Sequence, residues 1–135
     1  MKEIRLKKSV LTLLEEGIIH IHLLTGCDIT LPDAVRIVET MGALSAGKKL
    51  PVLIDVGEFT SVDKEVRIFS ASRESNLYTI ADGIVYRSFA QKLIADFYIK
   101  HNHPVVPTQA FPRRQEALNW LKTFILPTDN NHNLS

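Results

Sequence analysis

The sequence is short of the features that point directly to an activity. Its one cysteine, Cys27, cannot form a disulfide bond within the chain, which fits a reducing, cytoplasmic environment. No stretch approaches the roughly 18 apolar residues of a membrane-spanning helix, and the charged N-terminal residues lack the apolar segment of a secretion signal. A net charge of +1 shows no excess of either sign, so we expect neither a nucleic-acid partner nor an anionic membrane.

What is present is the composition of a folded domain. The chain has 135 residues, of which 45% are hydrophobic and 23% charged, and this length is enough for one domain with its own core. We expect a single domain over residues 1–126. Residues 127–135 begin with a proline and are almost entirely polar, so we expect a flexible tail there.

Two hydrophobic periodicities alternate along the chain and predict an α/β fold. Residues 10–14 and 18–23 are strand-like runs joined by a short connection ending in Gly17, which predicts an antiparallel hairpin. Further strands are predicted at residues 52–54, 80–86 and 104–111, each preceded and followed by a helical pattern. We therefore expect a mixed five-stranded sheet, with the N-terminal hairpin antiparallel, the remaining strands parallel, and four helices.

The helix starts carry local signals. Thr30 is a candidate cap for the first helix, and Thr60 or Ser61 for the second. Ser88 and Gln91 have the spacing of a capping box for the third. The third helix should bury an apolar face made of Ala90, Leu93, Ile94 and Phe97.

The second half of the chain carries a resemblance to a known family. The residues concerned are Ile84-Val85, Arg87-Ser88, Phe97, Pro104, Phe111 and the run Glu116-Ala117-Leu118-Asn119-Trp120-Leu121. In order and spacing, the chain from residue 9 to 124 resembles the STAS domain, the anti-sigma-factor-antagonist fold, and specifically its SpoIIAA-like, SEC14-related branch. This resemblance implies a bacterial regulatory or protein-interaction module without enzymatic activity.

The resemblance also implies that the usual phosphorylation site is missing. In phosphorylatable STAS members a strand ends in Asp, a loop follows, and an Asp-Ser pair opens the next helix; phosphorylation of that serine abolishes partner binding. Asp55 matches the first acid and Asp63 the second, but Lys64 stands where the serine belongs. Thr60 and Ser61 remain candidate phosphorylation sites, although helix capping is the simpler role for them.

Two functional hypotheses follow from the resemblance. The first is binding of an unidentified protein partner through an interaction loop made of Asp55, Gly57, Glu58, Phe59, Thr60, Ser61, Asp63 and Lys64. The alternative, from the SEC14 side, is a small apolar or lipid-like ligand held by Phe69, Leu77, Tyr78, Phe89, Phe97 and Tyr98. A homodimer through the edge strand of the first hairpin, or through an apolar helix face, is compatible with both hypotheses.

Other candidate sites are weaker. His20 and His22 share one face of a strand and are two of the four ligands that a zinc site needs, but no partner cluster has a recognisable spacing. We instead expect a strand face with Ile19 and Ile21 packed inward. Arg87, Lys100, Arg113 and Arg114 could form a small anion site but are more simply solvated charges. We therefore expect no metal site, no cofactor and no catalysis.

Overall fold

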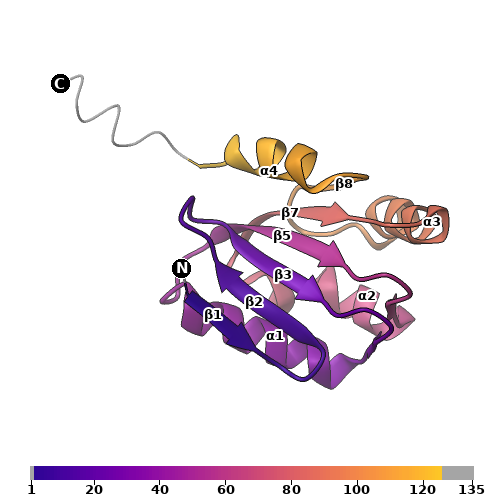
Figure 1. The fold of residues 1–135 in the computed structure, drawn as a ribbon, viewed down its shortest axis with the longest axis horizontal. Helices are drawn as coiled ribbons and strands as arrows, with labels where there is room; N and C mark the ends of the chain where they lie inside the picture. The colour runs from indigo at the N-terminus through magenta and orange to yellow at the C-terminus, as the bar shows by residue number, and fades with distance from the viewer. Residues whose placement is uncertain (1, 126–135) are drawn as a thin grey trace.

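The computed structural model describes residues 2–125 and has a mixed α/β architecture (Figure 1). The main sheet has six strands in the order β1-β2-β3-β5-β7-β8. These strands are β1 (Lys2–Arg5), β2 (Ser9–Leu13), β3 (Ile19–Leu23), β5 (Leu50–Val56), β7 (Thr79–Val85) and β8 (Thr108–Phe111). A separate parallel pair is formed by β4 (Asp28–Ile29) and β6 (Ser61–Val62). The helices are α1 (Leu31–Leu44), α2 (Lys64–Ser70), α3 (Phe89–Phe97) and α4 (Arg114–Lys122), with short turns η1 (Glu74–Asn76) and η2 (Tyr98–Asn102).

The predicted number of strands in this sheet is wrong, because β1 was missed. This strand pairs antiparallel with β2, with Lys2 opposite Leu13 and Arg5 opposite Val10. Three of its four residues are exposed, so it lacks the apolar alternation by which strands are recognised. Charged side chains are typical of an edge strand, and β1, not the predicted hairpin, forms this edge of the sheet. The β2–β3 hairpin and the parallel order of β3, β5, β7 and β8 are confirmed.

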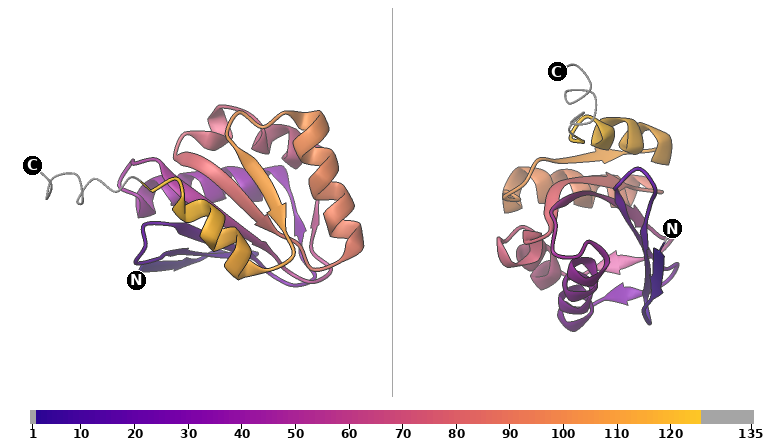
Figure 2. Two further views of the ribbon diagram at one scale, coloured as in Figure 1. Left: turned by 90° about the horizontal axis from the view of Figure 1, so that it is seen from above. Right: turned by 90° about the vertical axis from the view of Figure 1, so that its left-hand side faces the viewer.

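The helices divide between the two faces of the sheet. Helices α1 and α2 lie on one face and α4 lies on the other, as Figures 1 and 2 show. On the first face the core contains Ile21, Met41 and Val52. On the α4 face it contains Leu53 and Leu121. Two separate cores therefore lie on opposite faces of one sheet, each covered by its own helices.

Helix α3 is capped as predicted but is not buried as predicted. The Ser88 hydroxyl accepts a hydrogen bond from the Gln91 amide at 3.1 Å. The predicted apolar face, however, is open to solvent: Leu93, Ile94 and Phe97 are each about half exposed. Ala95 is buried instead. The helix follows β7 at the end of the sheet, where the four-residue strand β8 is too short to cover a whole helix face.

Helix α2 begins at Lys64, with Asp63 in the capping position. The prediction that Thr60 or Ser61 caps this helix is therefore wrong. Residues 61 and 62 form β6, so a short strand stands where the helix was expected to begin. Among residues 2–125, no helix combines the length and the apolar character needed to cross a bilayer. The predicted tail at residues 127–135 lies outside the described residues.

Candidate functional site

A cavity of about 590 Å³ lies between the sheet and the helices on its α1 face. Alternate residues of three neighbouring strands form its floor, because successive strand residues point to opposite faces. These floor residues are Ile21, Leu23, Val52, Ile54, Val56, Thr79, Asp82 and Ile84. The walls come from α1, α2, α3 and η2 and include Ala34, Ile37, Val38, Met41, Val66, Ile94, Ala95 and Tyr98. Its volume falls within the range of small-molecule sites, about 300–1,000 Å³, and its lining is mainly apolar, as theirs is.

The predicted interaction loop forms part of the cavity wall. Glu58, Phe59, Thr60 and Ser61 all line it. Phe59 is 81% exposed and has a φ of 61°, in the left-handed region that a bulky residue rarely adopts. An aromatic side chain in a strained backbone and open to water is a costly arrangement, and such arrangements are typical of contact sites.

Gly57 fixes the start of this loop. Its amide donates a hydrogen bond to the Leu23 carbonyl at 2.8 Å, and the Thr60 amide donates to the Gly57 carbonyl at 3.1 Å. A Cβ atom on Gly57 would collide with backbone atoms of Leu23, Leu24 and Thr25. The glycine is required because two backbone segments approach too closely for any side chain.

The two candidate phosphorylation residues have different surroundings. Thr60 is buried, and its hydroxyl donates to the Leu24 carbonyl. Ser61 is exposed, and its hydroxyl donates to the Asp28 carboxylate. Asp63 and Lys64 occupy the cap and the first helical position of α2, where the Asp-Ser pair of STAS members is expected. Phosphorylation of either hydroxyl stays a prediction.

Asp55, the predicted strand-end acid, faces away from the cavity and is held in an ion-pair corner on the α4 side. Its Oδ1 lies 3.0 Å from Arg87 Nη2, and its Oδ2 lies 3.5 Å from His20 Nε2. The second contact is long for a hydrogen bond, so it is the weaker of the two. Burial alone would raise the pKa of Asp55, but the interactions with His20 and Arg87 outweigh burial and lower it.

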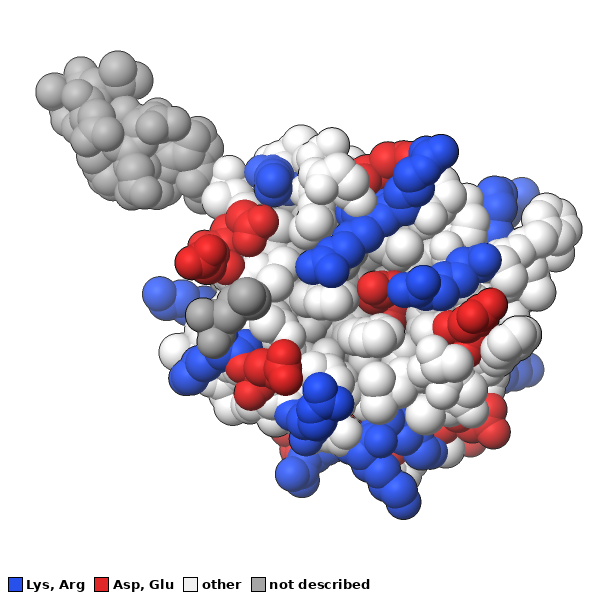
Figure 3. All heavy atoms as spheres, viewed as in Figure 1, with Lys and Arg blue, Asp and Glu red and all other residues white. Residues whose placement is uncertain are grey.

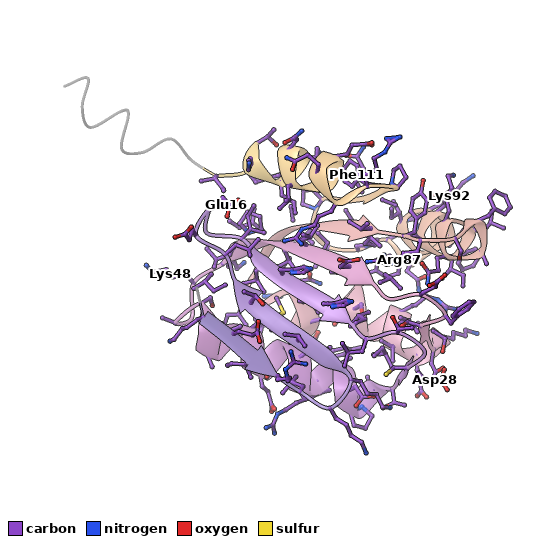
Figure 4. The ribbon with its side chains drawn as sticks, viewed as in Figure 1. Glu16, Asp28, Lys48, Arg87, Lys92 and Phe111 are labelled. Carbon is purple, nitrogen blue, oxygen red and sulfur yellow. The ribbon has the colours of Figure 1, made fainter. Side chains whose placement is uncertain are left out.

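The same corner links α3 to the interaction loop. Arg87 also donates from Nε to the Val56 carbonyl at 3.0 Å, and Gln91 donates from Nε2 to the Gly57 carbonyl at 3.0 Å. The Gln91 side-chain oxygen accepts from the Arg87 amide at 2.7 Å. Figure 4 shows Arg87 between the end of the sheet and α3, with Lys92 farther out on the helix. We refer to Asp55, Arg87, Gln91 and Gly57 as the Asp55 corner.

Asp82 is a second buried carboxyl, and it lies on the cavity floor. It is 7% exposed, and burial is the cause that raises its pKa to about 7. No residue within 2–125 donates a hydrogen bond to its carboxyl group. Sequence reasoning missed it, although an acid inside the apolar run 80–85 was a signal that could have found it.

The other predicted residues are not brought together as a site. His20 and His22 stack with ring centroids 6.2 Å apart, while Ile19 and Ile21 are buried as expected. Within residues 2–125 no group of three or more His, Cys, Asp and Glu side chains is placed to hold a metal ion. Of the six side chains predicted to hold an apolar ligand, Tyr98 lines the cavity, and the other five are absent from its lining within those residues.

A second, shallow cleft lies at the carboxyl ends of β5 and β7. Arg87, Lys92 and Arg114 line it together with Asp55. Arg87 is paired with Asp55, and Lys92 with Asp96 at 2.8 Å. Figure 3 shows basic and acidic side chains interspersed over this face of the molecule. The cations of the cleft are therefore largely neutralised by neighbouring carboxylates.

Comparison with known proteins identifies a family and a fold. A family model described as a domain of unknown function (DUF7793) matches residues 12–125. The chain belongs to the DUF7793 family. No curated protein matches it significantly. Among solved structures, the DUF7793 chain is similar to an uncharacterised protein of the DUF3478 family from Shewanella loihica PV-4, which has a SpoIIAA-like fold.

That similarity concerns the fold alone. The two chains share 13% sequence identity with a TM-score of 0.55, over 89% of the DUF7793 chain and 90% of the other. The SpoIIAA-like fold inferred from the sequence is thereby confirmed, although the matching family model is DUF7793 and not a STAS model.

Proposed function

We propose that this protein is a non-enzymatic binding module that holds a small, largely apolar molecule in the cavity between the sheet and helices α1, α2 and α3. The observation that carries the proposal is the cavity itself, of about 590 Å³, with a floor and walls made mainly of aliphatic side chains. Side chains around such a space lack the close packing found in protein interiors, and a bound apolar molecule would supply it. The ligand is the SEC14-like alternative that the family resemblance suggested.

The exposed apolar residues beside the cavity support the same proposal. Phe59 is 81% exposed and Ile94 is 47% exposed. Phe59 and Ile94 line the cavity from the loop and from α3. Apolar side chains at a pocket opening give an apolar ligand a continuous surface from solvent to the interior.

A cavity-filling variant tests the proposal. Ile84 lies on the floor and is partly buried, so Ile84→Phe should reduce the space without removing a hydrogen bond. Val35→Phe is the matched control, because it adds the same aromatic ring on an exposed position of α1 outside the lining. We expect Nile red, a neutral apolar dye, to bind the parent and Val35→Phe alike and Ile84→Phe at least about tenfold more weakly. Equal dye binding by all three proteins would contradict the proposal.

A native ligand should also be recoverable. Native mass spectrometry of protein freshly purified from its own host should show an additional mass that disappears when the protein is denatured. The additional mass should be absent or strongly reduced in Ile84→Phe and retained in Val35→Phe. A clean ligand-free mass for the parent protein would count against a tightly held natural ligand.

Docking of a protein partner through the interaction loop is the second candidate function. It is favoured by Phe59, which is 81% exposed at the tip of a loop anchored by backbone hydrogen bonds. Aromatic side chains held out in this way commonly dominate interface energies. Phe59→Ser and Lys64→Ala should each lower recovery of a specific partner in pull-downs, whereas Glu39→Ala, on α1, should not. Unchanged recovery with both loop variants would rule this surface out.

A further inference from the structure

Asp82 is an unusual residue to find on the floor of an apolar cavity. It lies in the middle of β7, opposite Val52 of β5, with Ile84 two residues along on the same face. Asp82 is almost completely buried, with 7% of its surface exposed. Within residues 2–125 no group donates a hydrogen bond to the carboxyl, and its oxygens are not among the fully enclosed polar atoms, so they open onto the cavity, where a ligand could supply the missing partner.

An unpartnered carboxyl is expensive at this position. Transferring a charged carboxylate from water into an apolar site is strongly unfavourable, so a buried acid takes up a proton or finds a donor. Burial raises the pKa of Asp82 to about 7, which leaves the group partly ionised near neutral pH.

Tyr98 places a second unpartnered polar group in the same cavity. It is buried, lines the cavity from the turn after α3, and has no hydrogen-bond partner for its hydroxyl within residues 2–125. Burial raises the pKa of Tyr98, and the nearby charge of Asp82 raises it further. The cavity thus offers a carboxyl and a hydroxyl in an otherwise apolar lining, the arrangement that orients a ligand with one polar end.

We propose that the ligand is an amphiphile with a cationic amine head, which pairs with the Asp82 carboxylate while its apolar body lies along Ile54 and Ile84 toward Phe59. The inference rests on the proposed ligand-binding function and specifies the ligand class. An amine satisfies the carboxylate because it supplies both hydrogen-bond donors and the opposite charge. A hydroxyl head supplies a donor without charge, and a carboxylate head would be repelled.

Three probes with the same chain and different heads test the inference: decylamine, 1-decanol and decanoic acid. Titration calorimetry of the full chain at pH 8 should show decylamine binding at least about tenfold more tightly than either of the others. Asp82→Asn should lower the affinity for decylamine to that for decanol. Asp96→Asn is the matched control, since it removes an exposed carboxylate of α3 outside the cavity lining and should leave the preference intact.

The outcomes separate this inference from the function on which it depends. If all three probes bind the parent protein equally, the amine head is wrong and the apolar cavity function stands. If decylamine binds Asp82→Asn as tightly as the parent, Asp82 is not the pairing group. If no probe binds the parent, the ligand-binding function fails, and the inference fails with it. The comparison of head groups on the parent protein needs no variant, so it holds even if Asp82→Asn folds poorly.

The pH dependence provides an independent readout. The affinity for decylamine should rise between pH 6 and pH 8, as Asp82 loses its proton, and should change much less in Asp82→Asn. Comparison with that variant distinguishes the pH dependence caused by Asp82 from any caused by the other charged or titratable groups that line the cavity. These groups are Glu58, Arg67, Tyr86, Arg87 and Tyr98. The same pH dependence in both proteins would overturn the assignment of the head group to Asp82.

Discussion

Two buried aspartates on neighbouring strands of one sheet have opposite surroundings. Asp55 on β5 faces the α4 side, where Arg87 lies 3.0 Å away and His20 3.5 Å away, and its pKa is lowered. Asp82 on β7 faces the cavity, has no donor within residues 2–125, and its pKa is raised to about 7. The same residue type is thus satisfied by the protein itself on one face and left unsatisfied on the other. A buried acid with protein partners is explained by the fold, whereas one without partners needs another explanation, which the proposed ligand would supply.

The largest expected effect is the dependence of the free energy of unfolding on pH that Asp82 causes. Because the pKa of Asp82 is raised from 3.8 to about 7 in the folded state, the folded protein holds more protons than the unfolded chain between those pH values. The free energy of unfolding should therefore fall as pH rises from about 4 to 7. Asp82→Asn cannot titrate, so its stability relative to the parent should increase by up to about 4 kcal/mol over this range. Urea unfolding at pH 4.5, 6 and 8 measures the difference, and a difference independent of pH would refute the contrast between the two acids.

The second largest effect is a loss of stability when Gly57, a member of the Asp55 corner, is given a side chain. Gly57→Ala should lower the free energy of unfolding by about 2–3 kcal/mol, because its Cβ collides with backbone that cannot move aside easily. Gly47→Ala is a useful control for backbone strain alone, because Gly47 has a φ of 79° and no atom within 4 Å of an added Cβ, whereas the φ of Gly57 is not positive. Thermal or urea unfolding should show the loss at Gly57 exceeding that at Gly47. A loss at Gly57 no greater than that at Gly47 would mean that the close approach of Leu23, Leu24 and Thr25 does not require a glycine at position 57.

Asp55→Asn should act in the opposite sense to Asp82→Asn. The lowered pKa of Asp55 means that its carboxylate stabilises the fold above the unfolded pKa of about 3.9, and that this contribution is lost as pH falls further. We expect Asp55→Asn to cost about 1–2 kcal/mol at pH 7, a modest figure because Arg87 is half exposed to water. The cost should shrink toward pH 3. A variant as stable as the parent at pH 7 would show that the ion pair contributes nothing.

The sequence predicts features set by neighbouring residues better than it predicts contacts between residues far apart in the chain. The β2–β3 hairpin and the Ser88 cap were predicted correctly because residues close together in the chain determine them. Strand β1 was missed, since its charged residues carry no apolar period. The predicted capping role of Thr60 or Ser61 was wrong because the hydroxyl partners of these residues, Leu24 and Asp28, come from more than 30 residues away.

Burial of a helix or strand face depends on what lies opposite, and the sequence does not reveal it. The amphipathic pattern of α3 is real, yet the face predicted to be buried is largely exposed, because little of the sheet lies beneath it. Likewise, the apolar run around Asp82 predicts a strand covered on both sides, but not that one side faces a cavity. The sequence singled out the interaction loop because strand ends are where α/β folds form sites. It did not predict that this loop lines the cavity.

The smallest effect tests the link between the Asp55 corner and the cavity. Gln91 donates to the Gly57 carbonyl and accepts from the Arg87 amide, so it joins the start of α3 to the loop that carries Phe59. Gln91→Ala removes both bonds at a partly exposed position and should cost about 1 kcal/mol of stability. Gln115→Ala, which removes an exposed bond to Asn119 on α4, is the matched control and should cost less. If the corner holds the cavity wall in place, Gln91→Ala should also speed amide hydrogen exchange in residues 57–61, while Gln115→Ala leaves that exchange unchanged. Unaltered exchange in both variants would mean that the loop is held by its own backbone hydrogen bonds. The Asp55 corner would then have no influence on the wall of the cavity that contains Asp82.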